Sequence, residues 1–251
     1  MKSQILAIDS TEQACSVALS ANGEITQRLE MAPRKHSEML LPMVEQLLEA
    51  ATISLTQLDA IAFACGPGSF TGLRIATGVV QGLAYGAELP VVPVSSLASL
   101  AHTAFRQNAL QAPHQFLVAL DARMNEVYVA PYRVDKIGVV KCLSEELVCP
   151  PQDVAVHYGN LFNNDPSGDA SLSQKEGDIQ WSGAGSGWCY HEIFQQQLSS
   201  LRDYRTDVMI EAIDVLYLAE TLFERGVAVS AEKALPVYLR ESVTWKKLPG
   251  R

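Results

Sequence analysis

A glycine-rich turn is the segment whose residue types most clearly allow chemistry: residues 64–76 read ACGPGSFTGLRIA. Free N–H groups at the start of a helix after such a turn can bind an anion, and the hydroxyls of Ser69 and Thr71 can cap that helix. The spacing excludes three known motifs. A Walker A loop needs a lysine after the glycines, a dinucleotide fingerprint needs glycine at position 71, and a nucleophile elbow needs serine where Phe70 stands. The turn is either an anion site or a tight corner between strand and helix.

Two aspartates, Asp9 and Asp121, are the acidic candidates, because each follows an aliphatic run and precedes a polar stretch. Facing each other across a cleft, they could organise Mg²⁺ and phosphates as in two-lobed phosphotransferases. Alternatively, each aspartate caps its own turn. The first hypothesis gives a candidate nucleotide-binding set, with the glycines of 183–187 as a further contact: Asp9, Thr11, Gly66, Gly68, Ser69 and Asp121.

The histidines and cysteines lack the spacing of a metal site. The five histidines include no H-x-x-x-H or H-E-x-x-H pair, and the five cysteines include no C-x-x-C. Scattered cysteines in odd number also argue against a disulfide framework. We therefore expect no metal and no disulfides, and no serine motif indicates a Ser/His/Asp arrangement.

The strands that must position these residues are repeated along the chain. The segments QILAIDSTEQACSVALS (4–20) and QFLVALDARMNEVYVAPY (115–132) each read as a strand, a turn with an aspartate and a return strand. Each therefore predicts a β-hairpin with an acid at the bend. Aligned without gaps, Asp9 falls on Asp121 and Val17 on Val129. This repetition predicts two related lobes.

Helices and strands alternate through the rest of the chain, which indicates a mixed sheet with helices on its faces, an α/β class. Apolar residues at helical spacing predict a helix over 36–50, which Pro42 should kink or confine to a later start. The other expected elements are a strand at 59–65, a helix at 71–86, a strand at 91–94, a helix at 95–105, a polar surface insertion at 163–178, a strand entering a glycine-rich turn at 179–188 and a helix at 208–226.

The predicted helix after the glycine-rich turn carries a stripe of three glycines. Gly78, Gly82 and Gly86 recur every four residues and so share one face. Each costs a helix about 1 kcal/mol relative to alanine, a cost that close backbone approach must offset. The approaching partner is either the sheet beneath the helix or another helix, including one from another subunit.

Composition and charge narrow the function classes. With 251 residues, 48% of them hydrophobic, the chain can bury the core of one large domain or two lobes. No apolar run approaches the roughly 20 residues of a membrane span, and the start is too short and too soon polar for a signal peptide, so we expect a cytoplasmic protein. A net charge of −9 makes the chain alone a poor nucleic-acid binder. The locally basic tail is expected to be solvated: Arg240, Lys246, Lys247 and Arg251.

Several segments together resemble the TsaB (YeaZ) family of bacterial tRNA threonylcarbamoyladenosine biosynthesis proteins. They are ILAIDSTEQACSVAL, HSEMLLP, GPGSFTGLRIATGVVQGLAYG, VVPVSSLASLA, ALDARMNEVYVA and PVYLR, and the resemblance is most specific over 4–130. It implies the two-lobed actin/hexokinase/Hsp70-like (ASKHA) fold, with duplicated mixed sheets and flanking helices. The implied lobes are residues 1–112, which carry the partner-binding helices, and 113–251, whose terminal helix at 208–225 could pack back on the first lobe.

The resemblance also implies an accessory role in threonylcarbamoylation of adenosine 37 in tRNAs that read codons beginning with A. The family's catalytic subunit is a paralogue, TsaD, which shares the G-P-G turn and binds a metal through an H-x-x-x-H pair. In this chain Ser96 and Leu100 stand at the matching positions, and neither can replace an imidazole ligand. The resemblance therefore implies that this chain is a non-catalytic scaffold without a cofactor of its own. ATP would bind only at the level of the complex.

In the family, the first two helices form the contact surface with a partner. The resemblance places these helices at residues 36–50 and 72–87 of this chain. The implied partners are TsaD and the ATPase TsaE, with a homodimer when the chain is alone and tRNA held mainly through the complex. Gly82→Leu or Met43→Glu is expected to abolish co-purification with TsaD while the chain stays folded. The predicted partner-binding residues are His36, Met39, Leu40, Met43, Val44, Leu47, Leu73, Thr77, Gly78, Gln81, Gly82 and Tyr85.

Two alternatives stay open beside the scaffold. An ATP-dependent phosphotransferase of the same fold would use the candidate nucleotide set, and tight binding and turnover of Mg-ATP by the isolated chain would favour it. A metalloprotease would need metal-binding histidines at a spacing that the chain lacks, and metal analysis of the purified protein would decide between this alternative and the scaffold.

Overall fold

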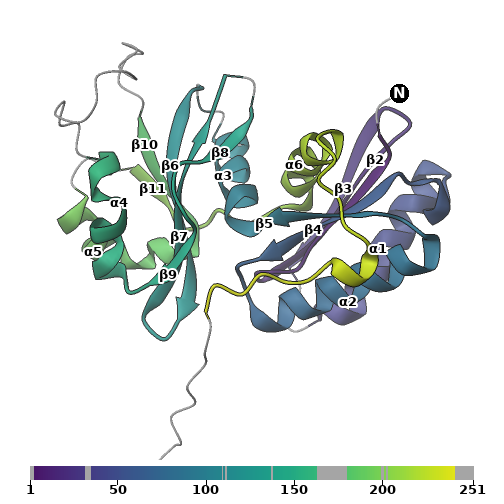
Figure 1. Cartoon of the computed structure of the whole chain (residues 1–251), viewed down its shortest axis with the longest axis horizontal. Coiled ribbons are helices and arrows are strands. Elements are labelled where there is room, and N and C mark those ends of the chain that lie inside the picture. Colours follow the sequence, from purple (N-terminus) through teal and green to yellow (C-terminus); the bar gives the residue numbers. More distant parts are fainter. Residues whose placement is uncertain are drawn as a thin grey trace, which may run out of the picture.

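The computed structural model describes residues 3–31, 35–108, 110, 112–136, 138–162, 180–198, 201 and 203–240. Two sheets stand side by side with a pair of helices between them and further helices on their outer faces (Figure 1). The polar insertion predicted at 163–178 and the basic residues beyond Arg240 lie outside the described residues.

The first lobe is built on a five-stranded sheet in the order β3-β2-β1-β4-β5. The strand β1 is antiparallel to β2 and parallel to β4. Every residue of β1, β2 and β4 is buried, which explains why these segments are apolar without strict alternation. The strands are β1 (Ile5–Asp9), β2 (Ala14–Ala21), β3 (Glu24–Met31), β4 (Ala60–Gly66) and β5 (Val91–Ser95).

The second lobe repeats this plan in the order β8-β7-β6-β10-β11, with the short β9 pairing to β7. As in the first lobe, the initial hairpin is antiparallel and the following strands are parallel. The strands are β6 (His114–Arg123), β7 (Glu126–Val134), β8 (Val140–Cys142), β9 (Leu147–Cys149), β10 (Trp181–Ala184) and β11 (Asp203–Arg205). The predicted hairpins and the predicted duplicated α/β fold are both confirmed.

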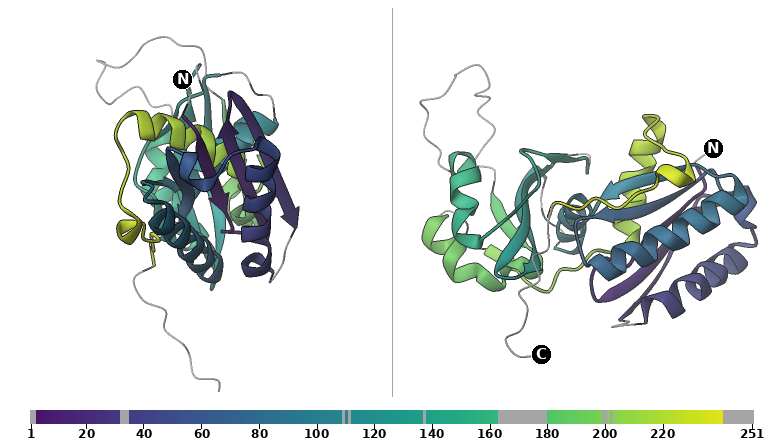
Figure 2. Two further views of the ribbon diagram at one scale, coloured as in Figure 1. Left: turned by 90° about the vertical axis from the view of Figure 1, so that its right-hand side faces the viewer. Right: turned by 60° about the horizontal axis from the view of Figure 1, so that its bottom comes forward.

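Helices cover both faces of each sheet (Figure 2). The outer face of the first sheet carries α1 (His36–Ala51) and α2 (Phe70–Ala87), and that of the second carries α4 (Val154–Phe162) and α5 (His191–Gln197). Between the sheets lie α3 (Ser96–Gln107) and α6 (Ala212–Glu224). Each side of each sheet is thereby closed by an apolar layer, as a two-sided sheet requires.

One helix keeps its predicted start despite a proline, and another begins later than predicted. Despite Pro42, α1 begins at His36, because the burial of Leu40 and Val44 against the sheet outweighs the lost backbone hydrogen bond. The helix predicted from residue 208 begins at Ala212. Side chains of the first lobe hold its approach: the Ile210 N–H donates to Glu12 (2.9 Å) and the Ala212 N–H donates to Ser16 (2.9 Å).

A buried carboxylate joins the two central helices. Asp214 of α6 is 0% exposed. It accepts hydrogen bonds from Thr103 Oγ1 (2.8 Å) and from Arg106 Nε (3.0 Å) and Nη2 (2.8 Å), and its Oδ1 lies 2.6 Å from His102 Nδ1. These α3 side chains hold the pKa of Asp214 below its usual value despite burial. The network thus joins α3, the last helix of the first lobe, to α6, the last helix of the second lobe.

The last described segment, residues 227–240, runs back across the first lobe and is called here the C-terminal strap. It begins with a bridge in which Val91 and Val229 exchange backbone hydrogen bonds of 2.8 Å. It continues through a short 3₁₀ helix, η4 (Ala231–Lys233). Arg240 then pairs with Glu126 of the second lobe. The strap thus lies beside α2 and links it to the second lobe (Figure 1). Within the described residues, no helix is both long and apolar enough to cross a membrane.

Candidate functional site

Half of the predicted partner-binding side chains lie in the chain's own core. These residues are at most 7% exposed: Leu40, Met43, Val44, Leu47, Leu73 and Thr77. An amphipathic helix must place its apolar stripe on the sheet that holds it, so the stripe read from the sequence is the core-facing one. This corrects the predicted set, and with it the expectation that Met43→Glu leaves the chain folded. The residues still available to a partner are His36, Met39, Gly78, Gln81, Gly82 and Tyr85.

The glycine stripe of α2 faces away from the sheet. Gly78, Gly82 and Gly86 are exposed, and a Cβ atom built on any of them would meet no described atom outside its own helix within 4 Å. The sheet is therefore not the surface that these glycines approach. These three helix-weakening residues lie on an open face, so no close backbone approach within the described chain offsets their cost.

The strap extends this open face beyond the helix. Gln81 Nε2 donates to the Ala234 carbonyl (3.0 Å), and farther along the helix the Phe70 and Tyr238 rings lie 5.6 Å apart. The Arg74 guanidinium lies 4.0 Å from the Phe70 ring centroid. Exposed apolar side chains cluster along this edge, with Phe70 55%, Leu235 62%, Val237 43% and Tyr238 44% exposed. Aromatic residues and arginine are the types that dominate protein–protein interfaces.

The glycine-rich turn packs against segments of its own chain. A Cβ at Gly66, where φ is +124°, would lie 2.4 Å from the Val237 carbonyl oxygen of the strap. A Cβ at Gly72 would lie 1.9 Å from the Ser10 carbonyl oxygen, and one at Gly68 would lie 2.9 Å from Thr11 Cβ. Ser69 caps α2 by accepting a hydrogen bond from the Gly72 N–H. These close backbone approaches explain the glycines and favour the tight-corner interpretation.

The two aspartates each cap their own hairpin. Asp9 Oδ1 accepts from Thr11 N (3.1 Å) and Thr11 Oγ1 (2.6 Å), and Asp121 Oδ1 accepts from Arg123 N (2.9 Å). In both hairpins the backbone N–H two positions after the aspartate donates to its carboxylate. The two lobes are therefore alike in this hydrogen bond as well as in their strand order. Burial raises the pKa of Asp9 to about 6. Its second carboxylate oxygen is buried without a hydrogen-bond partner among the described residues.

Both hairpins are also held by contacts with later segments of the chain, one of them between the lobes and others within the second lobe. Glu12 accepts from Ile210 N, and Ser186 Oγ at the second lobe's glycine-rich turn accepts from Asp121 N (3.2 Å). Burial raises the pKa of Glu12 to about 7, with the nearby Asp9 adding to the shift. A Cβ at Gly185 would lie 2.4 Å from the Ala119 carbonyl oxygen. Protein atoms thus occupy the space beside the glycines of this turn, as they do in the first turn.

The positions that the resemblance aligns with metal ligands have structural roles. Ser96 Oγ accepts from Gly66 N (3.2 Å) and so ties α3 to the glycine-rich turn, while Leu100 is fully buried in the central core. Across the described ranges, no three His, Cys, Asp or Glu side chains are grouped as a metal site requires.

One serine–histidine–aspartate group exists, which the sequence did not indicate. Ser182 Oγ lies 2.9 Å from His114 Nε2 and donates to Asp203 (3.3 Å). In a catalytic triad the aspartate bonds to the histidine, which in turn bonds to the serine. Here the aspartate contacts the serine hydroxyl, so the order of these contacts is not that of a triad.

The fold and the surface together define a class of protein. Two copies of a β-β-β-α-β-α-β-α unit packed around central helices form a two-lobed α/β protein of the actin/hexokinase/Hsp70-like class. Its clearest open feature is a helix face and not a cleft. The features that sequence reasoning missed are the strap and Arg74. In the sequence the strap was marked by the segment PVYLR, whose apolar Val237 and Tyr238 come just before the basic tail.

The comparisons with known proteins narrow this class to one family. A family model described as TsaD, tRNA N6-adenosine threonylcarbamoyltransferase, matches residues 27–245. The tRNA threonylcarbamoyladenosine biosynthesis protein TsaB of Escherichia coli K12 is 40% identical over 250 residues, covering 99% of both chains. Its Haemophilus influenzae counterpart is 36% identical over 254 residues, covering 98% of both. The chain belongs to the TsaB (YeaZ) family.

Solved structures agree with this assignment. YeaZ from Pseudomonas aeruginosa has a TM-score of 0.77 at 38% identity, with 94% of this chain and 100% of that chain covered. A second solved structure, of a protein described as having similarity to peptidase YeaZ from Pseudomonas aeruginosa, has a TM-score of 0.80 at 42% identity, with 95% of this chain and 100% of that chain covered. The two-lobed fold is therefore that of solved members of the family.

Proposed function

We propose that this chain is an accessory subunit for threonylcarbamoylation of adenosine 37 in tRNAs that read codons beginning with A. It acts by forming a heterodimer with, and activating, a catalytic subunit of the TsaD type. Membership in the TsaB family supports the pathway. The accessory role rests on the positions where TsaD-type ligands would stand, which here hold Ser96 and Leu100 in structural roles.

The observation that carries the proposal is the open glycine face of α2. Gly78, Gly82 and Gly86 allow another helix to approach the α2 backbone closely, and nothing within the described chain uses that space. Tyr85 lies between Gly82 and Gly86 along α2, and the partly exposed His36 and Met39 lie on α1, the helix that packs beside α2. Two helices presented side by side on an outer face suit packing against two helices of a partner (Figure 2).

The remaining parts of the proposed role follow from charge and pathway. A net charge of −9 supports a scheme in which other subunits make most of the tRNA contact, and a role in tRNA modification is consistent with a cytoplasmic location. TsaE is the proposed further partner, and a homodimer through the same face is proposed for the chain alone. The protein carries no cofactor of its own in this scheme, with ATP acting at the level of the complex.

The phosphotransferase alternative gains no support from the geometry. The candidate nucleotide residues Asp9 and Asp121 are bonded within their own turns, and glycines of both turns pack against protein atoms.

A deletion strain tests the proposal. Total tRNA from cells lacking the gene should contain strongly reduced threonylcarbamoyladenosine by mass spectrometry, and the wild-type gene should restore it. The tagged chain should co-purify with the TsaD-type protein. Unchanged modification in the deletion strain, or transfer of the threonylcarbamoyl group by the isolated chain, would overturn it.

A further inference from the structure

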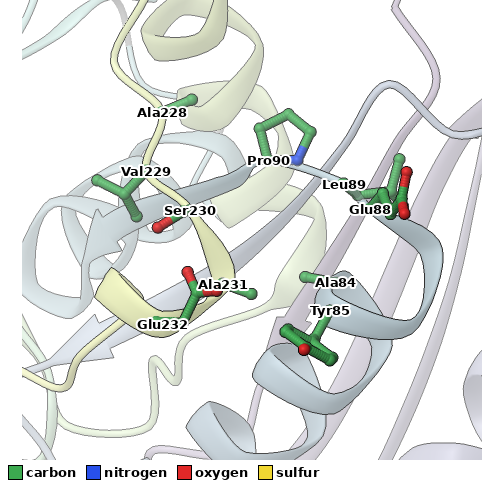
Figure 3. A pocket seen from close by; sticks show the side chains of 10 residues that line it. All are labelled: Ala84, Tyr85, Glu88, Leu89, Pro90, Ala228, Val229, Ser230, Ala231 and Glu232. Atoms are coloured by element: carbon green, nitrogen blue, oxygen red, sulfur yellow. The ribbon is translucent and has the colours of Figure 1, made fainter.

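A pocket of about 700 Å³ lies at one end of the open α2 face, between the last turn of the helix and the start of the strap (Figure 3). Its walls come from Ala84 to Pro90 on one side and from Ala228 to Glu232 on the other. The Tyr85 side chain, 72% exposed, stands at its edge. The pocket exists because the Val91–Val229 bridge holds the strap beside the helix end.

The two charged side chains that line this pocket are both acidic, although Lys233 lies next to Glu232 in the chain. Glu88 and Glu232 line it from opposite walls, and none of the ten described residues that line it is basic. The carboxyl end of α2 also points there, and a helix carries partial negative charge at that end. A hydrogen bond from Ser230 lowers the pKa of Glu232, which keeps this carboxylate ionised at neutral pH.

We propose that this pocket receives an arginine or lysine side chain of the TsaD-type partner when the partner docks on α2. The inference rests on the proposed function. A cation that enters the pocket lined by Glu88 and Glu232, beside a tyrosine ring and a helix carboxyl end, is matched in charge and in aromatic contact. The pocket is continuous with the open face, since Tyr85 borders the pocket and lies between Gly82 and Gly86 along the helix. A side chain inserted there fixes how far the partner helix can slide along the glycine stripe.

The test uses the purified full-length chain and the purified TsaD-type protein of the same organism. Glu88→Gln/Glu232→Gln removes both carboxylates from exposed positions, where the fold does not depend on them. The matched control, Glu145→Gln/Glu192→Gln, removes the same charge from exposed positions on the second lobe. Calorimetry measures Kd from about 50 mM to about 300 mM NaCl, and circular dichroism checks the fold of each variant.

The pocket variant should bind about tenfold more weakly than wild type, with a weaker dependence of Kd on salt. The control variant should stay within about twofold of wild type. Pocket and control variants with equal affinity and equal salt dependence would overturn the inference while the proposed function stands. Failure of the wild-type chain to bind the TsaD-type protein at all would instead overturn the proposed function.

Discussion

Replacing the α2 glycines with alanine should stabilise the isolated chain and weaken partner binding. Gly78 and Gly82 lie in the interior of an 18-residue helix with open space beside them. A methyl group at either position adds helix propensity without any clash in the chain itself. In the complex, the same methyl groups separate the two helices that the glycines allow to meet.

The magnitude follows from helix propensity, because no contact within the chain opposes it. Each glycine-to-alanine change is worth about 1 kcal/mol at an exposed helix interior, so Gly78→Ala/Gly82→Ala should raise the free energy of unfolding by about 2 kcal/mol. For a chain of this length, that corresponds to an increase in Tm of about 4–8 °C. Gly66→Ala should do the opposite and cost at least about 1–3 kcal/mol, because its Cβ would lie 2.4 Å from a strap carbonyl at φ +124°.

Differential scanning calorimetry of the isolated variants provides the assay, with Kd for the TsaD-type protein measured on the same samples. Wild-type chain and Gly66→Ala are the controls for direction. A double variant that unfolds at a lower temperature than wild type would show that the stripe packs inside the chain, and would refute the reasoning.

Three further predictions follow from burial and charge. Met43→Glu should lower the free energy of unfolding by about 3 kcal/mol, because Met43 is 4% exposed; an unchanged urea midpoint would contradict this. Burial raises the pKa of Asp9 to about 6 and of Glu12 to about 7, so between about pH 4 and pH 7 the folded chain binds protons that the unfolded chain has lost. The free energy of unfolding should fall as pH rises through that window, and less so in Glu12→Gln; equal slopes would count against burial as the cause. Asp214→Ala should cost about 3 kcal/mol, at the lower end for a broken buried pair because the Arg106 side chain is 35% exposed; a loss below about 1 kcal/mol by urea unfolding would remove the α3–α6 network from the account.

The sequence predicted the fold well because its signals are local. Each hairpin shows two apolar runs around an aspartate, and the spacing of leucines and methionines over 36–50 gives a helix by period alone. The start of α6 was missed because side chains far away in the sequence, Glu12 and Ser16, hold the residues before Ala212. No local pattern contains that information.

The candidate surface was only half predictable for a related reason. Period locates the apolar stripe of a helix but does not say whether a sheet or a partner covers it, so Leu40 and Met43 were assigned to the partner although they lie in the core. The glycine stripe could be seen in the sequence, but whether it faces the sheet or faces away from it became clear only from the packing of α2 on the sheet. The strap joins α2 only through tertiary contacts, among them the hydrogen bond from Gln81 to Ala234.

The affinity of the TsaD-type protein for Gly82→Leu tests the central claim most directly. Gly159→Leu is the matched control, because Gly159 also lies on a helix with nothing within 4 Å of its built Cβ, but on α4 of the second lobe. The account predicts that Gly82→Leu stays folded and loses at least about 100-fold in affinity, or about 2.7 kcal/mol, while Gly159→Leu binds as wild type does. Equal binding by both folded variants would contradict it.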